Sequence, residues 1–246
     1  MKVTTAVLGA LSAASVIMAG RHQKRVTREH SSNWSGAVVT GQNITGVSAT
    51  FPVLDANIPK VNETGKDAYL ATAWVGIDGY NATDDCPGLW QAGVQSENRD
   101  GDVSFMVWYE LFPLSPVFID LGNMTIGDLI SVELSTDDSE TEASVVMKNL
   151  NTGAEYKNST AITQKLCFKA AEWILERTYT LSGLAGLLDF GTATFLNLTY
   201  TEGGNEFDTL PDSVILTDIY DDEKNDVRQT YTNNTKDTVT VKYLGS

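Results

Sequence analysis

The stretch Leu89-Trp90-Gln91-Ala92-Gly93-Val94 carries the clearest structural signal in this 246-residue chain. Successive side chains of a β-strand point to opposite faces, so Trp90, Ala92 and Val94 share one face while Gln91 and Gly93 share the other. The first face suits a hydrophobic core. On the second, a polar amide beside a glycine leaves room for another chain. The stretch therefore predicts a strand with one buried face and one accessible face.

Similar alternating or β-branched runs recur along the rest of the chain, separated by turn-forming pairs such as Asp100-Gly101. Many short strands at this spacing predict an all-β sandwich or barrel. The segment 170–177 is ambiguous, because Glu172 and Glu176 are spaced as on a helix, but we interpret it as a strand. The predicted strands are 37–39, 47–51, 69–75, 90–94, 105–111, 129–134, 143–150, 187–200, 214–220 and 238–243.

The N-terminus is typical of a secreted protein. Residues 1–20 have a charged start and an apolar run too short for a confident membrane span, which predicts a signal peptide, with a signal anchor as the alternative. Residues 21–30 are basic, contain the dibasic pair Lys24-Arg25 and predict a short prosegment. No linker interrupts residues 31–246, so we expect one domain, soluble and extracellular once processed.

The chain also contains eight Asn-X-Ser/Thr sequons, which favour a eukaryotic secretory route. Asn33 is the poorest acceptor, because Trp34 follows it in a segment that looks buried. In an oxidising compartment, Cys86 and Cys167 most simply form one disulfide, and two buried free thiols are the alternative. The remaining glycosylation candidates are Asn43, Asn62, Asn81, Asn123, Asn158, Asn197 and Asn233.

The net charge of −15 is lopsided, since residues 31–246 alone hold 12 basic and 31 acidic residues. Such a surface repels nucleic acid and anionic membranes, so we expect neither as a partner. It also suits an acidic medium, where most carboxylates are neutral. A soluble acidic secreted protein without any activity has the same charge.

Histidine is nearly absent, and this restricts the chemistry. His22 and His30 both fall in the predicted prosegment, so the mature chain lacks the histidine of a Ser-His-Asp or Cys-His site and of most hydrolytic zinc sites. No nucleotide-binding or EF-hand motif is present. Carboxylates, amides and hydroxyls remain, which favours acid–base hydrolysis of peptides or glycans.

Several candidate site residues lie at strand ends. Trp74 lies near the end of a strand that runs into the acidic turn at Asp78. Trp108 and Glu110 share a strand face, and Glu172 stands between Ala171 and Trp173. Each also has a structural interpretation, because tryptophans usually pack in a sandwich core and these acids could be turn or solvated strand residues.

Taken in order, these segments resemble the fungal glutamic peptidases, or eqolisins. The resemblance covers roughly residues 31–243 and is most specific in Ala-Trp-Val-Gly-Ile-Asp-Gly at 73–79 and Ala-Glu-Trp-Ile at 171–174. Further matches are Asn-Trp-Ser-Gly-Ala-Val at 33–38, Leu89, Gln91, Gly93 and Val94, Trp-Tyr-Glu at 108–110, and Cys167. The sequence differs from the family pattern at Gln95, Leu111 and Phe112, and these differences bear on substrate preference. Its prosegment is much shorter than is typical of the family, which bears on the activation mechanism.

The resemblance implies a sandwich of two antiparallel sheets with lectin-like, concanavalin A-like architecture and an active site on a concave face. It implies a monomer that hydrolyses protein or peptide substrates in acid, with no metal and no cofactor. Glu172 would take a proton from water and return it to the leaving amine, while Gln91 would orient the water and stabilise the oxyanion, supported by Trp74, Asp78, Trp108 and Glu110. Two alternatives stay open: a retaining glycosidase that uses Glu110 and Glu172, and a non-catalytic carbohydrate-binding protein.

Overall fold

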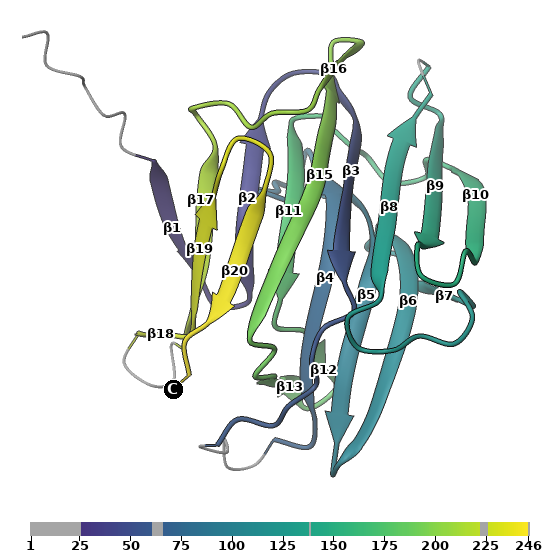
Figure 1. Cartoon of the computed structure of the whole chain (residues 1–246). Helices are drawn as coiled ribbons and strands as arrows, with labels where there is room; N and C mark the ends of the chain where they lie inside the picture. Colours follow the sequence, from purple (N-terminus) through teal and green to yellow (C-terminus); the bar gives the residue numbers. More distant parts are fainter. Residues whose placement is uncertain (1–25, 61–65, 138, 222–225, 246) are drawn as a thin grey trace, which may run out of the picture.

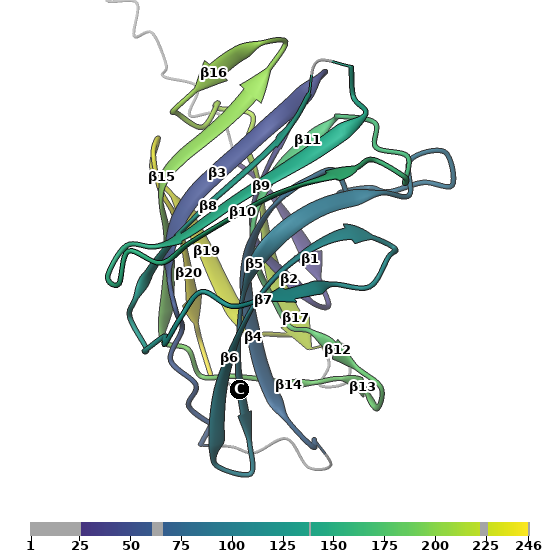
Figure 2. The same cartoon turned by 90° about the vertical axis from the view of Figure 1, so that its right-hand side faces the viewer.

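The computed structural model describes residues 26–60, 66–137, 139–221 and 226–245, which form two facing β-sheets (Figure 1). The predicted signal peptide, the start of the predicted prosegment and Asn62 lie outside these ranges. Turned by 90°, the molecule presents the edge strands β10 and β7 towards the viewer (Figure 2). In the described part of the chain, no helix is long and apolar enough to cross a membrane.

The larger sheet has ten strands and carries the candidate site. Neighbouring strands are antiparallel except for two parallel pairs, β1 with β17 and β14 with β4. Two short strands also belong to this sheet: β14 (Gly186–Leu187) pairs with β4, and β18 (Val227–Arg228) pairs with β17. Its order is β1 (Thr27–Ser31), β17 (Ile215–Asp221), β2 (Trp34–Thr40), β11 (Ala170–Glu176), β4 (Tyr69–Ile77), β5 (Leu89–Arg99), β6 (Asp102–Phe112) and β7 (Val117–Ile119).

The smaller sheet has eight strands and covers the inner face of the larger one. β16 (Asn205–Phe207) extends β15, and a separate hairpin joins β12 (Tyr179–Thr180) to β13 (Gly183–Leu184). Its order is β10 (Glu155–Ala161), β9 (Glu142–Asn149), β8 (Leu129–Thr136), β3 (Ile44–Pro52), β15 (Thr192–Glu202), β20 (Val239–Tyr243) and β19 (Thr230–Asn234).

The predicted alternation around Gln91 is confirmed. Trp90, Ala92 and Val94 are buried in the main core between the sheets, together with Trp173. Burying side chains of this size between two sheets is the largest favourable contribution to such a fold. A second, smaller apolar cluster lies on the outer face of the ten-stranded sheet and contains Trp74, Trp108, Val38, Leu89, Ala170 and Ile174. The tryptophans are therefore divided between core and site face.

The strand interpretation of residues 170–177 is confirmed by β11, whose residues Ala170–Leu175 are all buried. The predicted strand 187–200 is wrong as one element, because the chain turns at Gly191 (φ +65°) between β14 and β15. β10 and β19 were not predicted. Both are rich in polar residues and edge their sheet, where one-sided packing leaves no apolar alternation to detect.

The predicted boundary between prosegment and domain falls inside β1, because Thr27–His30 pair with β17 alongside Ser31. His30 therefore belongs to the folded sheet, where its ring stacks on that of Tyr220 with a distance of 3.8 Å between the ring centroids. The exclusion of histidine catalysis does not depend on whether His30 is removed. It rests instead on position, since His30 lies in β1 whereas Gln91 and Glu172 lie in the central strands β5 and β11.

Most described sequon asparagines are accessible for glycan attachment. Asn158 differs, because it is half-buried and its Nδ2, the atom that would carry a glycan, donates to Tyr109 Oη at 2.8 Å. Asn33 is half-buried as well, and its Nδ2 donates to Glu176 Oε1. The exposed sequon asparagines are Asn43, Asn81, Asn123, Asn197 and Asn233.

Candidate active site

Three acidic or amide side chains lie in one row across the ten-stranded sheet. The backbone register pairs Glu172 of β11 with Gly76 of β4, Gly76 with Gln91 of β5, and Gln91 with Glu110 of β6. Directly paired residues in a sheet point to the same face. Glu172, Gln91 and Glu110 therefore share one face, and Gly76 adds no side chain between the first two.

Two glycines, Gly76 and Gly93, make room for the close packing of Trp74 beside this row. A Cβ on Gly76 would lie 2.8 Å from the Trp74 ring, and one on Gly93 would lie 2.2 Å from the carbonyl oxygen of Ala73. Both distances are shorter than van der Waals contact, so larger residues would displace Trp74 or the backbone beneath it. These glycines leave room for the Trp74 indole in the next row on the same face of the sheet.

Glu172 is fully buried. Its Oε1 accepts a hydrogen bond from the Tyr80 backbone N–H at 2.7 Å, whereas its Oε2 has no partner among the described residues. Burial raises the pKa of Glu172 well above its ordinary value, and the charges of Asp78 and Glu176 add to this rise, while the Tyr80 N–H opposes it. One oxygen is thus fixed by the protein, and the other is buried without a partner among the described residues.

Gln91 is held by Glu110. Its Nε2 donates to Glu110 Oε2 at 2.5 Å, and its buried Oε1 has no partner within the described chain. The amide retains a second N–H beyond the one that Glu110 accepts. Burial raises the pKa of Glu110, and the hydrogen bond from Gln91 partly offsets that effect. Glu110 therefore orients the amide while leaving a donor and an acceptor free.

Asp78 fixes the backbone near both candidate residues. Its carboxylate accepts hydrogen bonds of 2.6–2.7 Å from the backbone N–H groups of Cys167, Phe168 and Lys169, which immediately precede β11. The Cys86–Cys167 disulfide joins the same segment to the loop before β5. Asp78 and the disulfide together set how β11 lies relative to β4 and β5.

Sequence reasoning missed Glu176, which lies four residues after Glu172 on β11. Its carboxyl accepts hydrogen bonds from Trp74 Nε1 at 2.9 Å and from Asn33 Nδ2 at 3.2 Å. Burial raises the pKa of Glu176 to about 7, although these hydrogen bonds lower it. Trp34 packs edge-on against Trp74 at 5.0 Å and helps to enclose this part of the site.

The buried carboxyl of Glu176 predicts that the fold is more stable in acid. An acid whose pKa is higher in the folded than in the unfolded state stabilises the fold when protonated, and this contribution disappears as the pH rises through that interval. For Glu176 the interval runs from 4.5 to about 7. At about 1.36 kcal/mol per pH unit, the free energy of unfolding should fall by about 3 kcal/mol.

Urea unfolding at about pH 4 and about pH 7.5 measures this contribution. Glu176→Gln should reduce the loss of stability between the two pH values by about 3 kcal/mol, whereas the exposed strand variant Glu133→Gln should not change it. An identical pH dependence in wild type and Glu176→Gln would contradict the assignment.

A cavity of about 380 Å³ opens beside the polar row. Its walls combine polar and apolar groups, and two aromatic side chains at its rim, Phe112 and Phe118, are 47% and 60% exposed. Exposed aromatic side chains at a cavity rim favour contact with an extended chain. The cavity is lined by Thr72, Gln91, Gln95, Trp108, Glu110, Phe112, Pro116, Phe118, Glu176, Thr178 and Tyr179.

The site residues predicted from sequence are thus largely brought together. Gln91, Glu110 and Glu172 share a row, and Trp74 and Trp108 lie in the next row on the same face. Asp78 does not join the row; its carboxylate binds the backbone N–H groups that precede β11. Among the described residues, no three His, Cys, Asp or Glu side chains are grouped as a metal site would require.

Comparison with known proteins agrees with this geometry. Residues 32–243 match the model of the Peptidase A4 family. The chain is 31% identical over 233 residues to aspergillopepsin-2 from Aspergillus niger, an alignment that covers 88% of this chain and 79% of the relative. It is 35% identical over 150 residues to scytalidopepsin B from Scytalidium lignicola, which covers 59% and 51%.

Solved structures of glutamic peptidases have the same fold. Scytalido-glutamic peptidase with a transition-state analogue inhibitor superposes with a TM-score of 0.71 at 27% identity, covering 87% of this chain and 98% of that one. Aspergilloglutamic peptidase from Aspergillus niger gives 0.62 at 33% identity, covering 72% and 99%. The chain therefore belongs to the Peptidase A4, or eqolisin, family and is a glutamic-type peptidase.

Proposed function

We propose that this protein is a secreted endopeptidase that acts in acid, with Glu172 and Gln91 as its catalytic pair. The observation that carries this proposal is the row in which Glu172 and Gln91 lie on one face of the sheet, on either side of Gly76. Each presents a buried oxygen without a protein partner, Glu172 Oε2 and Gln91 Oε1. A water molecule between them would find two acceptors for its protons.

The attack step follows from these atoms. Ionised Glu172 takes one proton from the water through Oε2, while Gln91 Oε1 accepts a hydrogen bond from the other and orients the lone pair towards the peptide carbonyl. The carbonyl oxygen gains negative charge as the tetrahedral intermediate forms. The N–H of Gln91 that Glu110 does not accept is the donor we assign to that oxyanion.

The second step returns the proton. Protonated Glu172 gives its proton to the amine nitrogen of the leaving group, the C–N bond breaks, and the carboxylate is regenerated. A buried carboxyl with a raised pKa suits both roles, because it is a stronger base when ionised and holds the proton until the amine leaves. Below this pKa the ionised fraction falls tenfold per pH unit, which sets the acid limb of activity.

Two observations support action in acid. The net charge of −15 arises mainly from carboxylates that become neutral in acid, so self-repulsion falls there. Glu110 and Glu176, which are not the proposed general base, have raised pKa values because they are buried, so the fold around the site is more stable when the medium protonates these two carboxyls. The predicted signal peptide and the sequons support secretion.

The glycosidase alternative is less well supported by the same row. Two intervening strands separate Glu172 from Glu110, which places their backbones roughly 14 Å apart at about 4.8 Å per strand. Gln91 lies between them and holds Glu110, while the Tyr80 backbone N–H holds Glu172. A retaining glycosidase needs its two carboxyl groups about 5–5.5 Å apart across the sugar.

Separate incubations with a protein substrate and a polysaccharide substrate test the proposal. The secreted protein is incubated at about pH 3 with denatured globulin and, separately, with β-glucan, conditions under which most surface carboxylates are protonated. We expect new peptide termini from globulin and no reducing sugar from the glucan. Sugar release without peptide release would select the glycosidase, and the absence of both would select a binding protein.

A further inference from the structure

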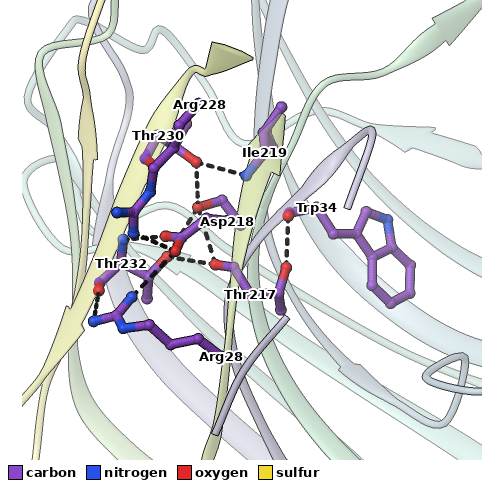
Figure 3. Close-up of polar contacts among 9 residues, drawn as sticks. Arg28, Trp34, Thr217, Asp218, Ile219, Arg228, Thr230 and Thr232 are labelled. Atoms are coloured by element: carbon purple, nitrogen blue, oxygen red, sulfur yellow. Dashed lines mark hydrogen bonds and ion pairs between the residues drawn. The ribbon is translucent and has the colours of Figure 1, made fainter. Parts of the chain in front are cut away.

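The outermost strand of the ten-stranded sheet, β1, is anchored to both sheets. The guanidinium groups of Arg28 on β1 and Arg228 on β18 both pair with Asp218 of β17, which is 2% exposed (Figure 3). Arg28 also donates to the carbonyl oxygen of Thr232 on β19 at 2.8 Å. The aromatic ring of Tyr231 lies 4.7 Å from Arg28 Cζ and 4.5 Å from Arg228 Cζ.

This arrangement gives β1 a fixed position. Asp218 accepts a further hydrogen bond from the Thr232 backbone N–H at 2.5 Å, so its buried carboxylate is well satisfied. The Arg28–Asp218 pair joins an edge strand of one sheet to a residue that in turn contacts β19 of the other. A strand held in this way can define the position of its next residue, Glu29.

Glu29 connects β1 to the candidate site. Its Oε1 accepts a hydrogen bond from Tyr80 Oη at 2.9 Å, and the backbone N–H of Tyr80 donates to Glu172 Oε1 at 2.7 Å. Tyr80 follows Asp78 and Gly79, which have φ values of +66° and +104°. Glycine adopts such angles freely and aspartate tolerates them, so this turn brings Tyr80 back towards Glu172 at little steric cost.

We infer that Glu29 and Tyr80 are positioning residues for Glu172 and that residues 27–30 remain part of the active peptidase. Glu29 fixes the Tyr80 side chain, the Tyr80 backbone N–H fixes Glu172 Oε1, and Oε2 is thereby directed to the reactant. Processing must then occur before Thr27, for which the dibasic pair Lys24-Arg25 is suitably placed. The inference rests on the proposed role of Glu172.

Three variants separate positioning from simple stability. Tyr80→Phe removes only the hydroxyl, Glu29→Ala removes the acceptor, and Glu29→Gln retains an acceptor oxygen. We expect the first two to lower kcat by roughly 3- to 30-fold with KM unchanged, as about 1 kcal/mol or somewhat more of lost orientation allows. Glu29→Gln should restore most of the rate, and Tyr80→Phe with Glu29→Ala should be no worse than either alone.

The pH profile provides a readout that a purely structural role would not change. The Tyr80 N–H lowers the pKa of Glu172, so loosening it should move the acid limb of kcat to higher pH in Tyr80→Phe and Glu29→Ala. A uniform loss at every pH with a lower melting temperature, a change in KM alone, or wild-type kinetics in both variants would overturn the inference. If Glu172→Gln were fully active, the proposed function would fail instead.

N-terminal sequencing of the active secreted enzyme tests the second part. We expect the chain to begin at or before Thr27, with Val26 as the residue exposed by cleavage after Arg25. A fully active enzyme that begins at Ser31 would overturn the assignment, because it would lack both Arg28 and Glu29.

Discussion

Glu172→Gln is expected to reduce peptide hydrolysis by roughly 10²- to 10⁴-fold, the usual cost of losing a general base. Gln has nearly the shape of Glu and can still accept the Tyr80 N–H, but it cannot take a proton from water. In acid the wild-type carboxyl is itself largely neutral because burial raises its pKa. The variant should therefore fold normally and lose only its chemistry.

Hydrolysis of a fluorogenic peptide, measured with a thermal melt in acid, checks this prediction. Glu133→Gln, which alters an exposed glutamate on a strand of the opposite sheet, should retain the wild-type rate and melting temperature. Residual activity of Glu172→Gln above about one per cent would place the general base elsewhere.

Gln91→Ala is expected to lower kcat by roughly 10²- to 10³-fold, as the loss of one oxyanion donor usually does. It removes both groups to which we assign roles, the acceptor for the attacking water and the donor for the oxyanion. Gln91→Glu should not restore the rate, because a second carboxyl would then lie beside Glu110 at hydrogen-bonding distance. Neighbouring carboxyls titrate as a pair, with at least one pKa raised.

The pH dependence of kcat distinguishes the two Gln91 variants. Gln91→Ala should show a low rate with an acid limb close to that of wild type, whereas Gln91→Glu should show a displaced profile because its carboxyl titrates. A Gln91→Glu enzyme with the wild-type rate and profile would argue against an amide as the oxyanion donor.

Much of the fold and the core of the site could be predicted from the sequence, because both depend on short-range patterns. Alternation alone assigns Gln91 to the face opposite Trp90, and both lie where that pattern requires. Alternation cannot distinguish a catalytic glutamate from a solvated one. The resemblance around Glu172 predicts a catalytic role for it, and the structure shows that its side chain is buried and therefore not a solvated strand residue.

Other features depend on contacts between distant segments. Glu176 resembles an exposed strand glutamate in sequence, and it becomes a buried acid only because Asn33, Trp34 and Trp74 meet around it. Gly76 separates Glu172 from Gln91 without a side chain because of the register of three strands, which the sequence does not specify. The basic charge pattern predicts a prosegment over residues 21–30, whereas the pairing of Arg28 with Asp218 joins residues 190 positions apart and cannot be read from the sequence.

The claim that Glu172 and Gln91 act as a pair on one water molecule is tested most directly by the double variant Glu172→Gln/Gln91→Ala. Its kcat/KM is measured beside those of the single variants on the same fluorogenic peptide. Residues that act as a unit give strongly non-additive losses, so the account predicts a double variant within several-fold of the poorer single variant. Losses that multiply, by a further factor of roughly 10² or more, would show that the two residues act independently and would contradict the account.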